Sequence, residues 1–333
     1  MKAAGLRGLL GPRGLPGLRG LLSGRATIGP LVALVATYAL FAALAPSTFT
    51  RASNLVTMAR QTTVVSIAAV GMTVIIVSGG IDLSVGSAVA FTTVVVAVVL
   101  KAGYGPLLAV LAGVGAATAS GAACGALVAR LRMAPFIVTL GAMSILRGAA
   151  KGLANEQKID CDPRGLDALL APSAGWPLAP PGVWLAVAVA VAGAILLRTT
   201  RFGRHVYAIG SNEATALVCG VDVARVKVVV YALAGALAGL AGVLEFSTLT
   251  VGDPTDSIGL ELEVIAAVVI GGASLSGGEG TVLGSIVGAM LMTVIRTGCT
   301  FVGVHNWVQE IATGAIIVVA VAVDRLRHRS RGP

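Results

Sequence analysis

Apolar residues form long runs along most of the chain, and short polar or glycine-rich segments separate one run from the next. Each run has about 17–25 residues, the length that a helix needs to cross the hydrocarbon core of a bilayer. The pattern therefore predicts an all-α, polytopic membrane protein with about ten transmembrane helices. The predicted spans cover residues 28–45, 57–78, 83–101, 106–129, 134–151, 182–198, 227–249, 262–277, 281–299 and 307–323.

The composition supports a membrane protein and excludes a soluble domain. Of the 333 residues, 56% are hydrophobic and only 12% are charged, and the mean hydropathy is +0.92. A soluble domain of this size needs more charged residues to cover its surface. We expect one transmembrane domain over residues 27–324. A flexible basic cytoplasmic tail over residues 1–26 precedes it, and a basic cytoplasmic tail over residues 325–333 follows it.

The distribution of Lys and Arg predicts the orientation in the membrane. If the N-terminus is cytoplasmic, sixteen Lys and Arg residues lie on the inner side and eight on the outer side. Cytoplasmic loops carry the excess of basic residues, so both termini are predicted to be cytoplasmic. The net charge of +9 is then an orientation signal, and no basic patch with interleaved aromatic residues suggests nucleic acid. The three tryptophans fall at the outer interface, where their rings anchor helices: Trp176, Trp184 and Trp307.

A carboxylate stands at a glycine-rich break between two apolar runs. Asp82 is the only carboxylate in the first 155 residues, and Gly79, Gly80, Ser84 and Gly86 surround it. An Asp at the centre of a membrane helix costs about 2.5–3.5 kcal/mol on insertion scales. Glycines at this spacing break or bend a helix. Asp82 either lines a translocation path or accepts hydrogen bonds from backbone groups that the break frees, and both roles stay open.

A second glycine-rich break occurs late in the chain. Residues 271–278 align with residues 79–86 and match them at Gly, Gly, Leu, Ser and Gly. Two interrupted apolar segments in the two halves of a membrane protein indicate a translocation path near the midplane. Small residues that let helices pack closely explain most of the 44 glycines, but they do not explain Asp82. The second break contributes Gly271, Gly272, Ser274, Ser276 and Gly277 to the predicted path.

The longest predicted cytoplasmic connection runs over residues 198–227. Connections between helices usually have only a few residues, so this loop indicates a docking surface for a cytoplasmic partner. A short helix is expected from about Asn212, with Ser211 or Asn212 as its N-cap. The predicted docking residues are Arg201, Gly203, Arg204, Asn212, Glu213 and Gly220.

Four blocks of the sequence stand out: residues 78–86, 134–148, 202–213 and 252–278. They resemble the permease subunits of ABC importers for monosaccharides, the ribose, xylose and galactose class. The resemblance covers about residues 50–325 in the order of that family. It implies a homodimeric, multi-pass permease in the bacterial plasma (inner) membrane that translocates a monosaccharide or similar polyol. It also implies a cytoplasmic ATP-binding subunit, which docks on the loop around Gly203 to Gly220, and an extracytoplasmic sugar-binding protein.

The sequence predicts no catalytic site, cofactor or metal site in this chain. Residues 275–279 (LSGGE) read like the signature motif of an ABC ATPase, but no P-loop accompanies them. The four cysteines are scattered without a CxxC pair, and no Ser-His-Asp or HExxH set occurs. We therefore expect ATP hydrolysis on a separate partner subunit.

One alternative from another class stays open. An ion-coupled secondary transporter of a small polar solute also uses glycine-broken helices and an intramembrane carboxylate. It is expected to carry more ionisable groups within its spans than Asp82 and a few glutamates near span ends. Co-purification of an ATPase separates the two alternatives.

Overall fold

The computed structural model describes residues 25–171 and 180–329, and its secondary structure is almost entirely helical. The all-α prediction is confirmed, because each predicted span contains a helix. Within the described residues, six helices are long and apolar enough to cross a membrane, namely α3, α5, α6, α7, α10 and α12, and three shorter apolar stretches lie in α1, α4 and α13. The helices are α1 (Arg25–Leu44), α3 (Ala52–Val77), α4 (Val85–Lys101), α5 (Pro106–Arg130), α6 (Pro135–Leu153), α7 (Pro181–Thr199), α10 (Val223–Leu249), α11 (Leu260–Ile270), α12 (Val282–Phe301) and α13 (Asn306–Arg329).

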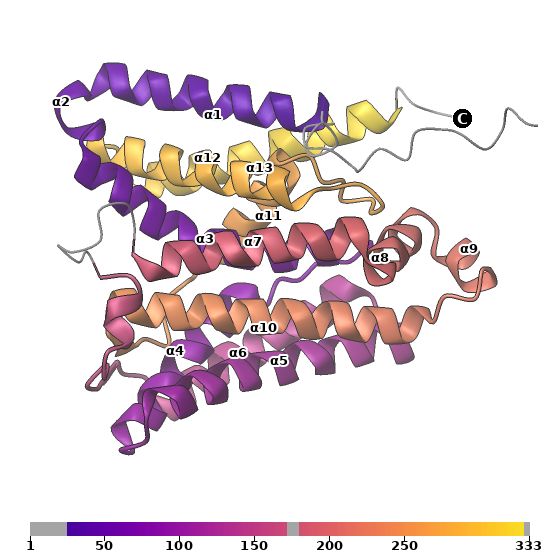
Figure 1. The fold of residues 1–333 in the computed structure, drawn as a ribbon, viewed down its shortest axis with the longest axis horizontal. Coiled ribbons are helices and arrows are strands. Elements are labelled where there is room, and N and C mark those ends of the chain that lie inside the picture. Colours follow the sequence, from indigo (N-terminus) through magenta and orange to yellow (C-terminus); the bar gives the residue numbers. More distant parts are fainter. Residues whose placement is uncertain (1–24, 172–179, 330–333) are drawn as a thin grey trace, which may run out of the picture.

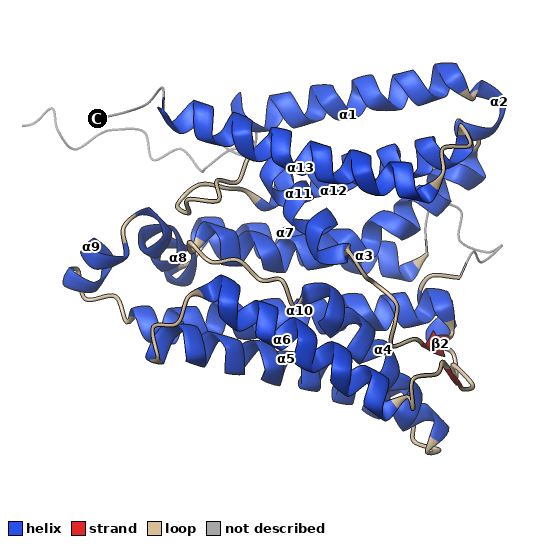
Figure 2. Ribbon diagram, turned by 180° about the vertical axis from the view of Figure 1, so that it is seen from behind, coloured by secondary structure: helices blue, strands red, loops and turns tan. Residues whose placement is uncertain are grey.

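The long helices lie side by side, and their connections gather at two opposite ends (Figure 1). The helices α8 and α9 project at one end, and the short strands lie at the other, as the reverse view also shows (Figure 2). The helix α1 begins, and α13 ends, on the side of α8 and α9. Following the predicted orientation, we call this side the inner end and the opposite side the outer end. The short elements are α2 (Pro46–Phe49), β1 (Ile159–Asp160), η2 (Leu166–Leu169), α8 (Arg201–Ser211), α9 (Glu213–Val218) and β2 (Val251–Gly252).

The helix α3 is the buried centre of the protein. Every residue from Thr62 to Val77 is buried, and α10, α12, α7 and α11 pack against it. A helix that is apolar on all sides is stable only where other helices surround it. The helices α5 and α6 lie at the periphery and instead expose large apolar side chains, including Leu107, Leu111 and Ile145. Such a surface suits contact with lipid.

Glycines allow the backbones of neighbouring helices to touch. A Cβ at Gly288 of α12 would collide with the carbonyl oxygen of Ala267 on α11. A Cβ at Gly235 of α10 would collide with the carbonyl oxygen of Ala117 on α5. Close helix packing is therefore the role of these glycines, as predicted for most glycines in the chain.

The predicted span over residues 262–277 is wrong in its extent. Its helix, α11, covers only Leu260–Ile270, which is about 16 Å of helix and half a bilayer. The chain leaves the helix at Gly271 and Gly272, and the second of these has a φ of +94° that ends a helix readily. The glycines therefore terminate this span where the hydropathy pattern predicts its continuation.

The structure describes only the ends of the predicted tails that adjoin the transmembrane domain. The helix α1 already begins at Arg25, and α13 continues to Arg329. Residues 1–24 and 330–333 of the predicted tails lie outside the described residues, as does Trp176. Trp184 lies in the first turn of α7 and Trp307 in the first turn of α13, both at the outer end and both more than half exposed.

Candidate functional site

The first predicted break separates α3 from α4. The helix α3 ends at Val77, where Ser78 donates its hydroxyl to the Ile75 carbonyl oxygen at 2.7 Å. Gly79 follows with a φ of +81°, and the Gly80 N–H also bonds to the Ile75 oxygen, at 3.0 Å. The chain then runs without helix until α4 begins at Val85. The predicted break is present at the predicted residues.

Asp82 is buried and bonds to the start of α4. Its Oδ1 atom accepts hydrogen bonds from the Ser84 backbone N–H at 2.7 Å and from the Ser84 hydroxyl at 2.6 Å. Ser84 directly precedes the first residue of α4, so the carboxylate satisfies a donor at the positive end of that helix. Gly86 lies one residue further, where a Cβ would collide with the Glu261 carboxylate. The first turn of α4 thus lies against the start of α11.

Two other helices hold the backbone of the first break. The Ile81 carbonyl oxygen accepts hydrogen bonds from the Thr139 hydroxyl of α6 at 3.3 Å and from the Tyr231 hydroxyl of α10 at 3.5 Å. The Tyr231 hydroxyl also fills the space where a Cβ at Gly80 would lie. Polar side chains therefore satisfy the backbone that the break frees, as a membrane interior requires.

The second break, residues 271–281, is a compact turn. The Ser274 N–H donates to the Glu279 carbonyl oxygen and the Gly277 N–H to the Ser274 carbonyl oxygen, both at 3.0 Å. The Ser276 N–H bonds to the Ser274 hydroxyl at 3.2 Å, and Gly277 has a φ of +84°. Ser274 and Ser276 therefore shape the turn itself.

The two breaks meet at a glycine of α8. The Gly278 N–H donates to the Val77 carbonyl oxygen at 2.9 Å, and a Cβ at Gly277 would lie 2.9 Å from the Gly79 Cα. A Cβ at Gly210 of α8 would collide with the same Val77 oxygen and lie 2.6 Å from the Gly278 nitrogen. We call Gly79, Gly210, Gly277 and Gly278 the glycine junction. It joins both breaks to α8, in the loop of residues 198–227.

Gly210 is the residue of this site that sequence reasoning missed. The two breaks are visible in the sequence because glycines interrupt apolar runs. Gly210 instead lies in a polar loop helix, and its contacts with Val77 and Gly278 join segments far apart in the chain. A second contact supports the junction, since the Tyr207 hydroxyl of α8 donates to the Gly280 carbonyl oxygen at 2.6 Å.

The predicted docking residues fold into α8, α9 and their turns. A Cβ at Gly203 would collide with the Leu197 carbonyl oxygen, so glycine lets α8 fold back onto α7. The Asn212 side chain caps α9 by accepting from the Thr215 N–H at 2.9 Å, which confirms one of the two predicted caps. Glu213 pairs with Lys227 of α10 at 2.6 Å. Arg201 and Arg204 are exposed on α8, and Gly220, with a φ of +84°, ends the turn after α9.

The tip of the loop is apolar and exposed. Leu217 and Val218 at the end of α9 are 60% and 88% exposed. The helix α9 projects at the inner end (Figure 1), and Arg201 and Arg204 are exposed on α8. An exposed apolar tip of this kind is a suitable contact surface for another protein.

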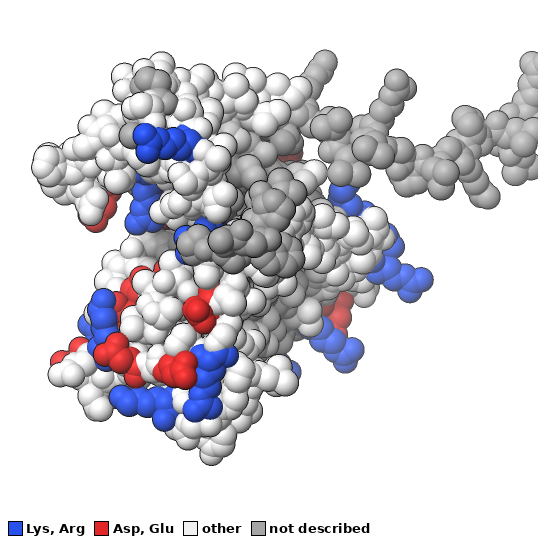
Figure 3. Space-filling model, turned by 60° about the vertical axis from the view of Figure 1, so that its left-hand side comes forward, with Lys and Arg blue, Asp and Glu red and all other residues white. Residues whose placement is uncertain are grey.

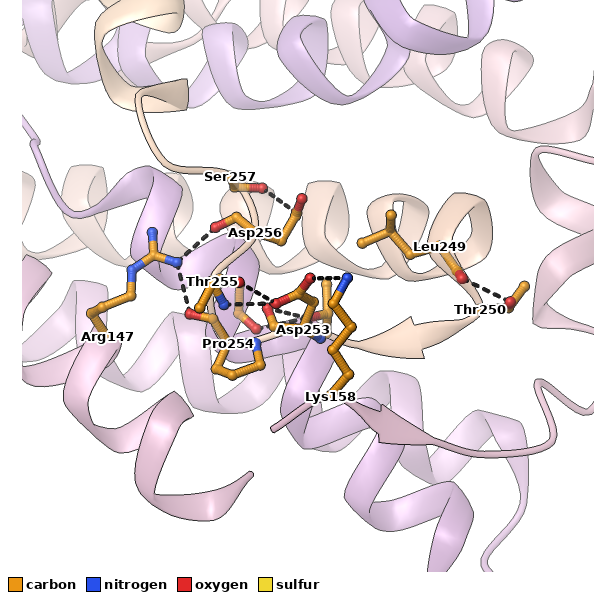
Figure 4. A network of polar contacts seen from close by, with 11 residues as sticks. Arg147, Lys158, Leu249, Thr250, Asp253, Pro254, Thr255, Asp256 and Ser257 are labelled. Atoms are coloured by element: carbon orange, nitrogen blue, oxygen red, sulfur yellow. Dashed lines mark hydrogen bonds and ion pairs between the residues drawn. The ribbon is translucent and has the colours of Figure 1, made fainter. Parts of the chain in front are cut away.

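Acidic and basic side chains gather on the outer end of the protein (Figure 3). Here β1 pairs with β2 in antiparallel register, with Ile159 opposite Gly252. Lys158 pairs with Asp253 at 2.9 Å, and the Asp253 Oδ1 atom accepts from the Thr255 N–H and hydroxyl (Figure 4). The Arg147 guanidinium of α6 donates to two carbonyl oxygens of the segment 253–257. This network fixes the segment that enters α11.

The charge of Asp253 is expected to stabilise this network in a pH-dependent way. Burial raises its pKa, but hydrogen bonds from Thr255 and Lys158 outweigh burial, so the pKa lies below the ordinary 3.8. A lowered pKa gives stability that is present above the ordinary value and is lost as the pH falls through the folded value. Asp253→Asn should therefore lower the melting temperature equally at pH 7 and pH 5, and the difference should shrink below pH 4. A difference that stays constant to pH 2 would contradict this origin.

Among the described residues, no three His, Cys, Asp or Glu side chains lie close enough to hold a metal ion. The cysteines are free thiols, and Cys161 has its pKa raised by burial. The polar groups of the breaks bond to backbone atoms and to one another. The arrangement is therefore that of two helix interruptions held in place by hydrogen bonds.

Comparison with known proteins gives one consistent family. Residues 54–321 match the family described as branched-chain amino acid transport system / permease component. The chain is 39% identical over 300 residues to the ribose import permease protein RbsC of Escherichia coli K12, covering 90% of this chain and 93% of that protein. It is 36% identical over 307 residues to the protein of the same name from Bacillus subtilis, covering 90% and 92%.

A relative named for another sugar is similar too. The L-arabinose ABC transporter permease protein AraH of Azospirillum brasilense is 36% identical over 270 residues, which cover 81% of this chain and 79% of that protein. No solved structure matches the chain.

Proposed function

The chain belongs to the family of branched-chain amino acid transport system permease components, and from this premise we propose that it translocates a monosaccharide or similar polyol. It is a multi-pass inner-membrane permease subunit of an ABC importer. The observation that carries the proposal is the 39% identity over 90% of the chain to a ribose import permease. The proposed partners are a cytoplasmic ATP-binding subunit, which hydrolyses ATP, an extracytoplasmic sugar-binding protein and a second copy of this chain.

The ATP-binding subunit docks on α8 and α9. The exposed Leu217 and Val218 form the apolar part of the contact, and the exposed Arg201 and Arg204 of α8 contribute charged groups. Asn212 and Glu213 hold α9 in place through the cap and the ion pair with Lys227. A force applied to α9 thereby reaches α8, which contacts both breaks.

The glycine junction converts this movement into a change of the inner half of the path. The helices α4 and α12 begin directly after the two breaks, so each can tilt relative to α3 and α11. When α8 moves, the Val77 end of α3 and the turn of residues 271–281 move with it, because their backbones touch. A hinge at broken helices is how many transporters alternate their access.

Asp82 stabilises the first break. Its carboxylate bonds to Ser84 at the start of α4, where the helix dipole favours a negative charge. Ser274 and Ser276 have the same role in the second break. The polar residues of both breaks therefore act as parts of the hinge, and the sugar is bound elsewhere.

Uptake by a reconstituted importer tests this function. The full chain, co-expressed with its ATP-binding subunit, should retain that subunit through purification. Sugar uptake into liposomes should then require ATP and the binding protein. Val218→Asp should remove the ATP-binding subunit, because a carboxylate replaces an 88% exposed apolar contact. The matched control is Val302→Asp at the outer end, where Val302 is 46% exposed, and it should keep the subunit.

Uptake by the isolated chain, driven by an ion gradient without any ATP-binding subunit, is the result that would contradict this function. It would favour the ion-coupled secondary transporter instead. Retention of the ATP-binding subunit by Val218→Asp would place the docking surface elsewhere.

A further inference from the structure

We propose that a groove at the outer end, between α3 and α12, is the site where the permease receives its sugar. The groove has a volume of about 430 Å³, and eight of its nine lining residues carry polar or charged side chains. This inference rests on the proposed function and adds a binding site to it.

The lining residues come from one face of each helix. Ser53, Thr57 and Gln61 follow one another at intervals of four residues on α3, and so share one side of it. Arg296 and Thr300 have the same interval on α12. The Thr297 hydroxyl donates to the Gln61 Oε1 atom at 3.1 Å and connects the two helices across the groove.

This face is unsuited to lipid. Thr57, Gln61 and Arg296 are exposed although they belong to helices that cross the membrane. Polar and ionisable side chains within spans normally face a water-filled cavity or another polar surface. The lipid-facing side of α5, by contrast, carries Leu107 and Leu111. The groove is therefore part of an aqueous path.

The chemistry of the groove fits a neutral polyol. Hydroxyl and amide groups both donate and accept, as the hydroxyls of a sugar do. The charge of Arg296 is balanced by Glu263, which lies 3.1 Å away and is 11% exposed. Asn54 is oriented by a 2.7 Å bond from its Nδ2 atom to the Phe49 carbonyl oxygen. Phe301 adds an aromatic ring, which the Phe49 ring supports edge-on at 6.0 Å.

The volume and the place of the groove fit delivery from outside. Ligand pockets commonly have about 300–1,000 Å³, so a groove of this size accepts one monosaccharide. Gln61 and Val77 lie sixteen residues apart on the same helix, or about 24 Å. The sugar thus occupies the outer part of α3 while the glycine junction closes its inner end.

Protection of an engineered thiol tests the groove. The four native cysteines are replaced by serine, and Thr57→Cys is introduced into the full importer in lipid nanodiscs without nucleotide. D-ribose, L-arabinose, D-xylose and D-galactose are then tested as protectants against a charged methanethiosulfonate reagent. At about ten times its dissociation constant, a bound sugar should slow the reaction about tenfold. Tyr104→Cys, at an exposed outer position away from the groove, is the control and should react at an unchanged rate.

A second cysteine variant and an anion control complete the experiment. Thr300→Cys repeats the measurement from α12, so that a folding defect of one variant does not decide the outcome. Inorganic phosphate tests an anion site, and protection by phosphate without protection by any sugar would overturn the proposal. Failure of all four sugars to protect either thiol would overturn it as well. Uptake into proteoliposomes is measured separately, so uptake tests the proposed function and protection tests the groove.

Discussion

Replacing Gly210 with alanine is expected to abolish sugar transport while the ATP-binding subunit stays bound and continues to hydrolyse ATP. The added Cβ would collide with the Val77 carbonyl oxygen and lie 2.6 Å from the Gly278 nitrogen, so α8 must move away from both breaks. Overpacking of this kind costs about 1–3 kcal/mol, which a protein of this size tolerates. A displacement of about 1 Å in a coupled site lowers a rate about 100-fold. Uptake and ATP hydrolysis are measured in the same proteoliposomes.

Gly141→Ala is the matched control for this variant. Gly141 lies in α6, is exposed, and has nothing within 4 Å of the position of an added Cβ. Alanine in place of glycine inside a helix stabilises it by about 0.8–1.0 kcal/mol, so this variant should fold and transport normally. Normal uptake by Gly210→Ala would show that α8 and the breaks move independently.

Asp82→Ala is expected to lower both stability and transport, whereas Asp82→Asn is expected to keep both. Alanine leaves the buried Ser84 N–H without its acceptor, which costs about 1–3 kcal/mol of unfolding free energy. It also removes the negative group at the start of α4. Asparagine keeps an oxygen that can accept both Ser84 bonds, so the break keeps its shape. Thermal unfolding in detergent and uptake in liposomes measure the two effects.

The comparison between these two variants separates the two roles that the sequence left open for Asp82. Equal stability of both variants, with transport lost in both, would mean that the charge itself is used. Asp82 would then contact the substrate or an ion, and the helix-stabilising role would be wrong. If Asp82→Asn is stable and active while Asp82→Ala is unstable, the result supports the role of Asp82 in stabilising the first break.

The sequence predicts the breaks because their signal is local. Asp82 and the surrounding glycines stand out within an apolar run, and the Asn212 cap follows from a short polar side chain before a helix. The early end of α11 is less predictable, because Ala273 and Leu275 continue the apolar pattern for a few residues beyond Gly272. Only the backbone conformation at Gly272 distinguishes a helix from a turn there.

Contacts between distant segments leave no local signal. Gly210 touches Val77 and Gly278, yet neighbouring residues in the sequence say nothing of this. The groove could not be predicted from the sequence for the same reason. Thr57 and Gln61 of α3 form a groove only together with Arg296, which α12 places next to them. The contacts of Gly210 and the groove both arise from the packing of helices, and the hydrophobic periodicity of a single helix does not predict them.

The number of sugar molecules transported per ATP hydrolysed tests most directly whether the docking loop drives both breaks through Gly210. The ratio is compared among the unmodified importer, Gly210→Ala and Val218→Asp in proteoliposomes with saturating binding protein. Gly210→Ala should retain ATP hydrolysis with a ratio near zero, and Val218→Asp should lose hydrolysis and transport together. A ratio for Gly210→Ala equal to that of the unmodified importer would contradict the coupling of α8 to the breaks.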